Sequence, residues 1–153
     1  MWVPPEEKDP QLLHAPTRKH VCMYGAVQVA TGKLLTQECE RFDAMVFQNF
    51  LMMLVREHDG KRRIHLILDN AKYHHAILLE PFLEEHKDKL VLEFLPPYSP
   101  DLNPIERVWR LTRRLCVHNR YFAILSDLVK VVYAQFSLWA APNDALRRLC
   151  AIN

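Results

Sequence analysis

Two short apolar runs with a helix-like segment between them constrain the fold of this chain more than any other feature of its sequence. The first run covers residues 63–69 and ends on Asp69, and the second covers residues 90–95. Nearly continuous apolar runs of this length are typical of β-strands that are covered on both faces. Because a helix is expected over residues 75–87, the strand-helix-strand order predicts a parallel pair joined by a right-handed crossover, and hence an α/β fold.

The flanking segments add a hairpin and three helices to this unit. Residues 21–37 have the composition of a β-hairpin around a Thr-Gly-Lys turn. Asp43 is placed to cap an amphipathic helix that ends near residues 58–60. The periodicity of apolar residues predicts further helices over residues 104–118 and 126–139.

The predicted domain organisation is simple. A chain of 153 residues, half of them apolar, is long enough for one compact domain with a hydrophobic core. Prolines interrupt any regular period near the N-terminus, and Pro142 ends the last helical pattern. We therefore expect an irregular segment at residues 1–18, one domain at residues 19–141, and a tail or short helix at residues 142–153.

Charge and cysteine content limit the class of protein only loosely. The net charge of +2, from 20 Lys and Arg against 18 Asp and Glu, is too small to indicate a nucleic-acid partner by itself. The four cysteines lie far apart, which favours free thiols in a reducing compartment, and no zinc-ligand spacing is present. No segment reaches the ~20 apolar residues of a membrane helix. We expect a cytoplasmic protein without a membrane partner.

Asp69 and Glu106 are the residues best placed for chemistry. Asp69 lies at the carboxyl end of its predicted strand, the edge where open α/β sheets gather ligands. The proline-rich loop at residues 95–103 is short enough to hold Glu106, on the first turn of the next helix, beside that edge. Grouped carboxylates suit phosphoryl transfer with two metal ions, and hard oxygen ligands favour Mg²⁺, with Mn²⁺ able to substitute.

Structural roles explain the same two residues. Asp69 and Asn70 fit a simple strand-to-helix turn. With Asn103 as N-cap and Pro104 at the first helical position, Glu106 is placed to complete a capping box that stabilises the helix by roughly 1 kcal/mol. Position and spacing alone leave both interpretations open.

Two strings around these acids resemble a known family. Residues 68–74 read Leu-Asp-Asn-Ala-Lys-Tyr-His, and residues 95–109 read Leu-Pro-Pro-Tyr-Ser-Pro-Asp-Leu-Asn-Pro-Ile-Glu-Arg-Val-Trp. Together they closely resemble the catalytic domain of bacterial insertion-sequence transposases, which are mariner-like DDE superfamily endonucleases. The resemblance covers most of the chain. It implies a ribonuclease H-like mixed sheet flanked by helices, and magnesium-dependent DNA strand cleavage and strand transfer in DNA transposition.

The resemblance also assigns roles to individual residues. Asp69 matches the second acid of a catalytic triad and Glu106 matches the third, both as metal ligands. Asn70, His74 and Asn103 match polar positions of the motifs. The resemblance implies that these three residues orient the acids or contact DNA, and helix capping is the alternative.

The first acid of that triad is expected upstream of the position that Trp2 occupies in the resemblance. Glu6, Glu7 and Asp9 precede any strand pattern, so none of them is assigned to the triad. We therefore expect an incomplete domain that lacks the first central strand and is weakly active or inactive alone.

The resemblance implies DNA as the main partner, both as transposon ends and as target, and hence association with the nucleoid when DNA is bound. Further copies of the chain or a complementing transposase chain are the expected protein partners. Two alternatives remain for the function. The first alternative to an active transposase is a non-catalytic transposase remnant that retains at most DNA or metal binding. The second is a host nuclease on the same scaffold.

The helix after Glu106 carries a basic stripe. Arg107, Arg110 and Arg114 share one side of it, with Arg113 nearby, and such a stripe beside a metal site would neutralise phosphates of the strand being cut. A solvated charged face is the alternative. The stripe that we expect to be buried consists of Ile105, Val108, Thr112 and Leu115.

Two aromatic residues lie near the acids in the sequence. Tyr98 is in the proline-rich loop, and Trp109 is on the helix that follows it. Either ring is able to stack on a base, but an aromatic residue beside a proline-rich turn or on an apolar helix flank is more often packed. Both are therefore interpreted as packing residues.

Overall fold

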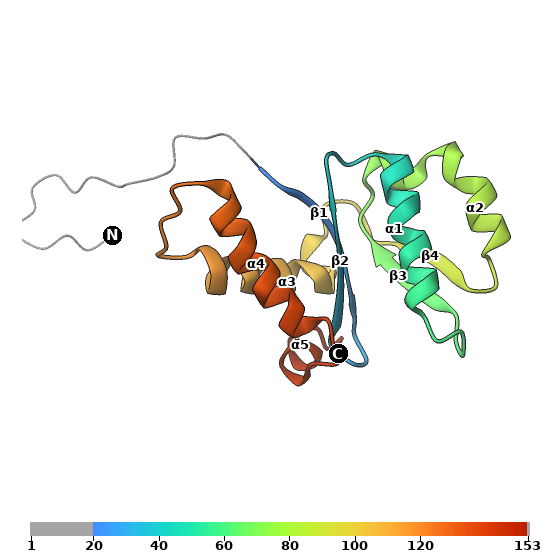
Figure 1. Ribbon diagram of the computed structural model, residues 1–153. Coiled ribbons are helices and arrows are strands. Elements are labelled where there is room, and N and C mark those ends of the chain that lie inside the picture. The colour runs from blue at the N-terminus through green and yellow to red at the C-terminus, as the bar shows by residue number, and fades with distance from the viewer. Residues whose placement is uncertain (1–19, 153) are drawn as a thin grey trace, which may run out of the picture.

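The computed structural model describes residues 20–152 and confirms an α/β fold. β1 (Cys22–Gln28) and β2 (Lys33–Cys39) form an antiparallel hairpin. β3 (Ile64–Leu68) pairs in parallel with β4 (Leu90–Phe94), which confirms the predicted parallel pair. Within the described residues the four strands form two separate two-stranded sheets (Figure 1).

Helices pack around both sheets. Asp43 precedes α1 (Ala44–Glu57), and its side chain accepts a hydrogen bond from the Val46 N–H at 2.9 Å, so the predicted N-cap is confirmed. No helix in the described part of the chain is long and apolar enough to cross a bilayer. The other helices and helical turns are η1 (Lys72–His75), η2 (Ile77–Leu79), α2 (Glu80–Glu85), η3 (Pro100–Leu102), α3 (Pro104–Thr112), η4 (Arg113–Val117), α4 (Leu125–Trp139) and α5 (Asp144–Leu149).

The helix expected over residues 75–87 is wrong in its first half. The chain forms the two 3₁₀ turns η1 and η2 first, and α2 starts only at Glu80. Pro81 explains the interruption. It has no N–H to donate to the Ile77 carbonyl, and its ring would clash there, so a helix accommodates it only in its first turn.

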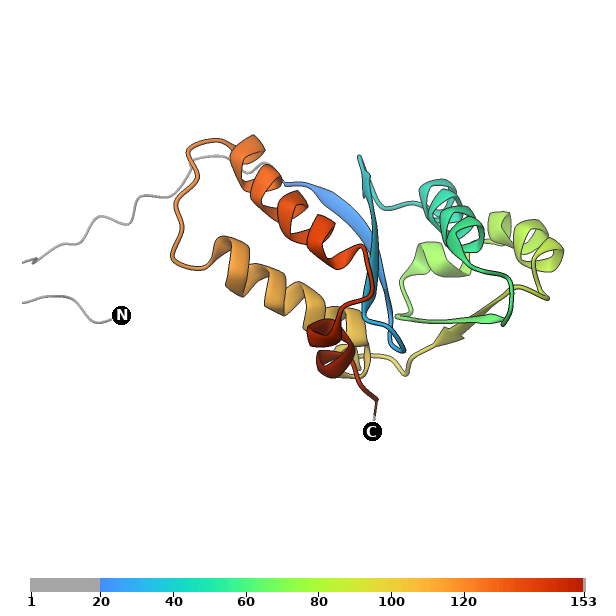
Figure 2. The same ribbon diagram turned by 60° about the horizontal axis from the view of Figure 1, so that its bottom comes forward.

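The β1–β2 hairpin is covered on both faces. Tyr24 points into a core that it shares with Phe47 and Phe50 of α1, whereas Leu34 belongs to a second core with Phe136 of α4 and Leu146 of α5. Alternate strand residues point to opposite faces, so one hairpin serves both cores. Figures 1 and 2 show the hairpin between α3, α4 and α5 on one side and α1, α2 and the β3–β4 sheet on the other.

Gly25 allows α3 to lie directly against the hairpin. A Cβ atom at this position would lie 2.4 Å from Cη2 of Trp109 and 3.6 Å from Cδ1 of Ile105. Glycine therefore leaves the space that the indole occupies on β1. The packing interpretation of Trp109 is confirmed, and the helix that carries Glu106 is anchored to the hairpin.

The helix that begins at Pro104 keeps its α-helical form only to Thr112, after which η4 makes one π-helical turn. The His118 N–H donates to the Arg113 carbonyl, five residues back, at 2.9 Å. Such a turn inserts one extra residue, so the buried face shifts by one position. Cys116 is buried instead of Leu115, which is 43% exposed, and the prediction of a buried Leu115 is wrong.

Candidate active site

Asp69 lies directly after β3, and its two carboxylate oxygens have different surroundings. Oδ1 accepts a hydrogen bond from the Ala71 N–H at 3.1 Å and lies 3.1 Å from Nδ1 of His74. Oδ2 has no hydrogen bond within the described residues, and the side chain is 65% exposed. Asp69 therefore stabilises the turn, as the structural alternative proposed, and still presents one oxygen to a ligand.

His74 contacts Asp69 from the interior of the protein. Its buried ring packs 4.4 Å from the Phe47 ring, between centroids, and its Nδ1 lies 3.0 Å from the Asp69 carbonyl oxygen. Both neighbours of Nδ1 are acceptors, so Nδ1 carries the proton. Burial lowers the pKa of His74, against the opposing effect of Asp69, which favours a neutral ring at neutral pH.

The loop after β4 leaves the sheet beside Asp69. The Leu95 N–H donates to the Leu68 carbonyl at 2.9 Å, and the side-chain amide of Asn70 donates to the Leu95 carbonyl. Oδ1 of Asn70 also lies 3.2 Å from Nε2 of His75. Asn70 thus ties together the ends of the two parallel strands.

Glu106 is half-buried on the first turn of α3, and it does not complete a capping box. The Asn103 side chain caps the helix by accepting from the Ile105 N–H at 3.4 Å, while the Asn103 N–H donates to the Pro100 carbonyl at 2.9 Å. Within residues 20–152 the Glu106 carboxylate has no hydrogen bond or ion pair. Its oxygens are not among the buried polar atoms left without a partner in the described residues, so solvent or a ligand can reach them.

These contacts give Asn103 and Glu106, the two motif residues at the start of α3, different roles. Asn103 is 8% exposed and is used as a cap, so its side chain has a structural task. Glu106 has none in the described residues, which leaves its carboxylate available for a ligand.

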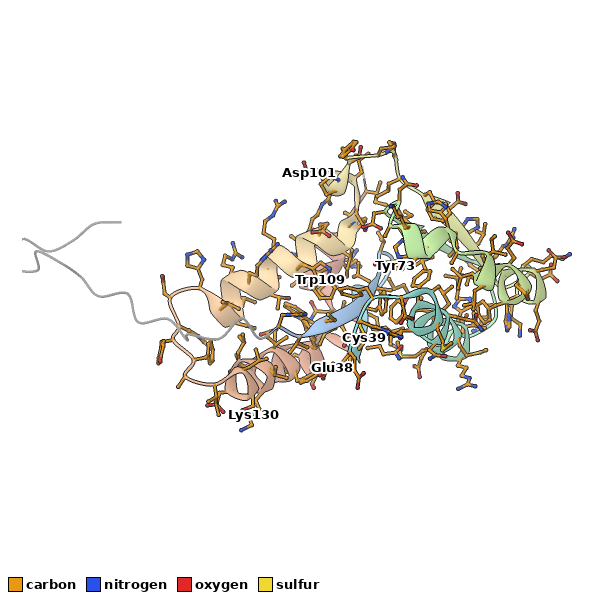
Figure 3. All side chains as sticks on the ribbon, turned by 90° about the horizontal axis from the view of Figure 1, so that it is seen from above. Glu38, Cys39, Tyr73, Asp101, Trp109 and Lys130 are labelled. Carbon is orange, nitrogen blue, oxygen red and sulfur yellow. The ribbon has the colours of Figure 1, made fainter. Side chains whose placement is uncertain are left out.

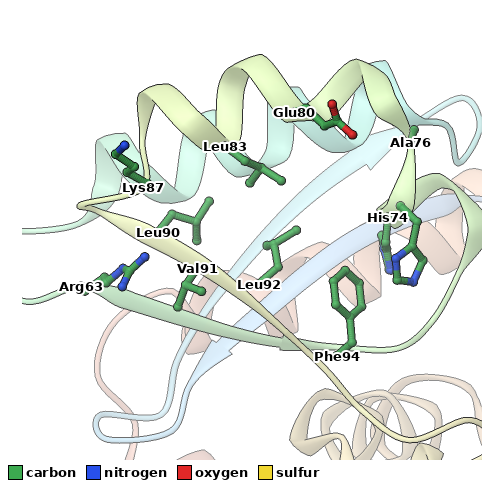
Figure 4. A pocket seen from close by; sticks show the side chains of 11 residues that line it. Arg63, His74, Ala76, Glu80, Leu83, Lys87, Leu90, Val91, Leu92 and Phe94 are labelled. Carbon is green, nitrogen blue, oxygen red and sulfur yellow. The ribbon is translucent and has the colours of Figure 1, made fainter.

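Neither of the described pockets is lined by the two acids. One, of about 370 Å³, lies between α2 and the β3–β4 sheet and is lined by His74, Leu83 and Phe94 among others (Figure 4). The other, of about 670 Å³, is a groove between β1 and β3.

The side chains of Asp69 and Glu106 offer donor atoms of the kind that a hard divalent cation prefers. Within the described residues no group of three or more His, Cys, Asp or Glu side chains is arranged to hold a metal ion. Oδ2 of Asp69 and the carboxylate of Glu106 are oxygen donors of the type that Mg²⁺ and Mn²⁺ prefer. The remaining ligand positions would fall to water, substrate phosphates or another donor.

Comparison with known proteins identifies the family. A family model described as DDE superfamily endonuclease matches residues 1–129. The chain belongs to the DDE superfamily of endonucleases. The uncharacterized protein y4pE/y4sA of Sinorhizobium fredii (strain NBRC 101917 / NGR234) is 36% identical over 107 residues, which cover 70% of this chain and 76% of that protein.

Three solved structures share the fold of this DDE domain. The catalytic domain of Mos1 mariner transposase has a TM-score of 0.62 at 20% identity, over 93% of this chain and 72% of that one. The Mos1 paired-end complex with left transposon end gives 0.71 at 22% identity, over 98% of this chain, and the Mos1 Strand Transfer Complex gives 0.67 at 23%, also over 98%. This chain spans 45% and 44% of the transposase chains in those two complexes.

The basic residues of the DDE domain have two different environments. Arg107 donates from Nη1 to the carbonyls of Leu149, at 3.1 Å, and Ala151, at 3.0 Å, at the end of α5. Its guanidinium is therefore committed to the fold. The other three arginines of the predicted basic stripe are exposed. They are Arg110, whose Nη2 lies 3.5 Å from Oδ1 of Asp101, Arg113 and Arg114.

Tyr98 is the residue that the sequence-based interpretation missed. Its side chain is 101% exposed, so the packing interpretation is wrong. The signal was present in the prolines on both sides, Pro97 and Pro100, which restrict how the loop can fold back to bury a ring. Figure 3 shows the loop near Asp101 projecting from the body of the DDE domain, beyond α3 and Trp109.

Proposed function

We propose that this chain binds DNA and contributes to metal-dependent cleavage and transfer of DNA strands, as a DDE transposase. The observation that carries the proposal is the Glu106 carboxylate, half-buried and without a partner among the described residues, in a chain that belongs to the DDE endonucleases. Two structural relatives are complexes named for a transposon end and for strand transfer. They support DNA as the partner here.

In this proposal Asp69 and Glu106 hold Mg²⁺, for which Mn²⁺ substitutes. A divalent cation at these oxygens would polarise the phosphoryl group and lower the pKa of bound water. His74 keeps Asp69 in position through its Nδ1, and Asn70 holds the loop that leads to Glu106. The exposed Arg110, Arg113 and Arg114 neutralise phosphates of the bound strand, a contact that is independent of DNA sequence.

The two-sheet arrangement supports a ribonuclease H-like fold with one further strand. Within the described residues β1 pairs only with β2, and β3 pairs only with β4. The groove of about 670 Å³ is lined by residues of both β1 and β3, including Val27 and Ile67. We propose that an extended strand from outside residues 20–152 lies in this groove, pairs with both strands and carries the first acid of the triad.

Unpaired strand edges favour association between molecules, so in the purified chain a second copy is expected to pair with these edges, without supplying the first acid. Sedimentation velocity should therefore show concentration-dependent self-association. Ile67→Lys, which places a charge in the groove, should reduce the association. Ile77→Lys is the matched control, because Ile77 is 78% exposed and lies outside the groove. A monomer at every concentration, with cooperative unfolding, would contradict this part of the proposal.

The proposed activity is tested by nicking of a supercoiled plasmid with the purified chain and Mn²⁺, against the same reaction with EDTA. We expect slow nicking that requires the metal, since two carboxylates hold a second cation poorly. DNA binding without nicking would favour a second candidate, a non-catalytic transposase remnant. The observation in favour of that candidate is that no three-residue metal cluster occurs in the described part of the chain. Absence of both binding and nicking would overturn both candidates.

A further inference from the structure

Tyr98 has a left-handed backbone conformation, which is unusual for a large side chain. Its φ angle is +57°. This left-handed region is uncommon for residues other than glycine, and turns that need it usually take Gly or Asn. Packing of the side chain often offsets the cost of such a conformation, but the Tyr98 ring is fully exposed and gains no packing. A bulky residue in a strained conformation on an exposed turn indicates a function for the ring.

The loop around Tyr98 is held firmly on both sides. Pro96, Pro97 and Pro100 fix three of its backbone φ angles. The Ser99 hydroxyl donates to the Pro97 carbonyl at 3.3 Å, and the Leu102 N–H donates to the Ser99 carbonyl at 3.2 Å. The backbone therefore presents the ring from a preorganised position.

The loop also joins the two halves of the candidate active site. At its start, the Leu95 carbonyl accepts from Asn70, the residue after Asp69. At its end, Asn103 caps the helix that carries Glu106. Arg110 approaches the same loop, with Nη2 3.5 Å from Asp101. A polymer bound across the two acids and the arginines would pass beside this loop, which projects from the domain in Figure 3.

We propose that Tyr98 stacks on an unpaired nucleobase of DNA bound at Asp69 and Glu106. This inference rests on the proposed function. Inside a duplex both faces of each base are covered, but a frayed or single-stranded segment beside a cut exposes them. An aromatic side chain on a preorganised loop gains stacking energy from any base, whatever the sequence. Tyr98 is a positioning residue in this scheme, since it acts on the strand and not on the reacting phosphate.

The experiment compares two DNAs of equal length in Ca²⁺, a hard cation for oxygen ligands, and gel electrophoresis checks that neither DNA is cleaved. One is a blunt duplex and the other carries a single-stranded 3′ overhang, and fluorescence anisotropy gives the affinity of the 153-residue chain for each. We expect tighter binding to the overhang, and Tyr98→Ala should remove about 10-fold of that preference. Tyr98→Phe should keep it. Tyr121→Ala is the matched control, because Tyr121 is also exposed but lies in a different loop.

The outcomes separate this inference from the function on which it rests. Equal preference for the overhang in the wild type and in Tyr98→Ala overturns base stacking and leaves DNA binding intact. Loss of the preference in Tyr98→Phe as well as in Tyr98→Ala also overturns it, because the phenol hydroxyl would then be the contact. If no variant binds either DNA, the proposed function fails together with the inference. Circular dichroism confirms that each variant is folded.

Discussion

Replacing Glu106 with alanine is expected to lower manganese-dependent nicking of DNA by at least about 100-fold, equivalent to about 2.7 kcal/mol of transition-state stabilisation. The same loss is expected for Asp69→Ala. Each change removes a carboxylate that is needed to hold a cation beside the scissile phosphate. The Glu106 side chain has no partner among the described residues, so its removal should leave the fold intact.

Matched variants show whether charge or position matters. Glu85→Ala and Asp88→Ala remove an exposed glutamate and an exposed aspartate away from the site, and neither should change the rate. Glu106→Gln keeps the size of the side chain but loses the charge, so it should fail almost as completely as alanine. Nicking that survives in both Asp69→Ala and Glu106→Ala would remove these residues from the metal site.

Gly25→Val is expected to destabilise the protein by about 3 kcal/mol, measured by urea denaturation. A Cβ atom alone would lie 2.4 Å from Cη2 of Trp109, and valine adds two methyl groups. The indole cannot move away easily, since it packs 6.0 Å from the Phe136 ring, between centroids, in the second core. Because this contact anchors α3, nicking should fall as well.

A second substitution checks the cause of that effect. Trp109→Leu removes the far part of the indole, so the double variant Gly25→Val with Trp109→Leu should lose less stability than the two single changes added together. Strict additivity would show that Gly25 and Trp109 do not contact each other as described. An unchanged denaturation midpoint in Gly25→Val would show the same.

Local sequence signals predicted most of the regular elements. Composition with a Thr-Gly-Lys turn predicted the hairpin, Asp43 predicted the N-cap, and two nearly continuous apolar runs predicted the parallel pair β3–β4. The errors have physical causes that act against periodicity. Pro81 delayed α2, and the π-helical turn η4 rotated Leu115 out of the buried face. The pattern of apolar residues in the sequence does not show where a helix will take in an extra residue, so periodicity could not predict this turn.

The assignment of the site residues stays a prediction, and the sequence did not predict their contacts. The strings around Asp69 and Glu106 pointed to these two acids, and only the folded chain shows which of their carboxylate oxygens already have partners. Asp69 does take part in a turn through Oδ1, whereas Glu106 does not take part in the capping box for which it is spaced. Arg107 contacts α5, 42 residues away, and no local pattern predicts such a contact.

That long-range contact has a practical consequence. Arg107 is the residue next to Glu106, and it grips the chain at Leu149 and Ala151, while Sγ of Cys150 lies 3.6 Å from the Pro104 carbonyl. The residues at the end of α5 therefore support the first turn of α3, which carries Glu106. Removing residues 149–151 would take away both carbonyl acceptors of Arg107, so it should weaken the start of α3 and lower any activity that depends on Glu106.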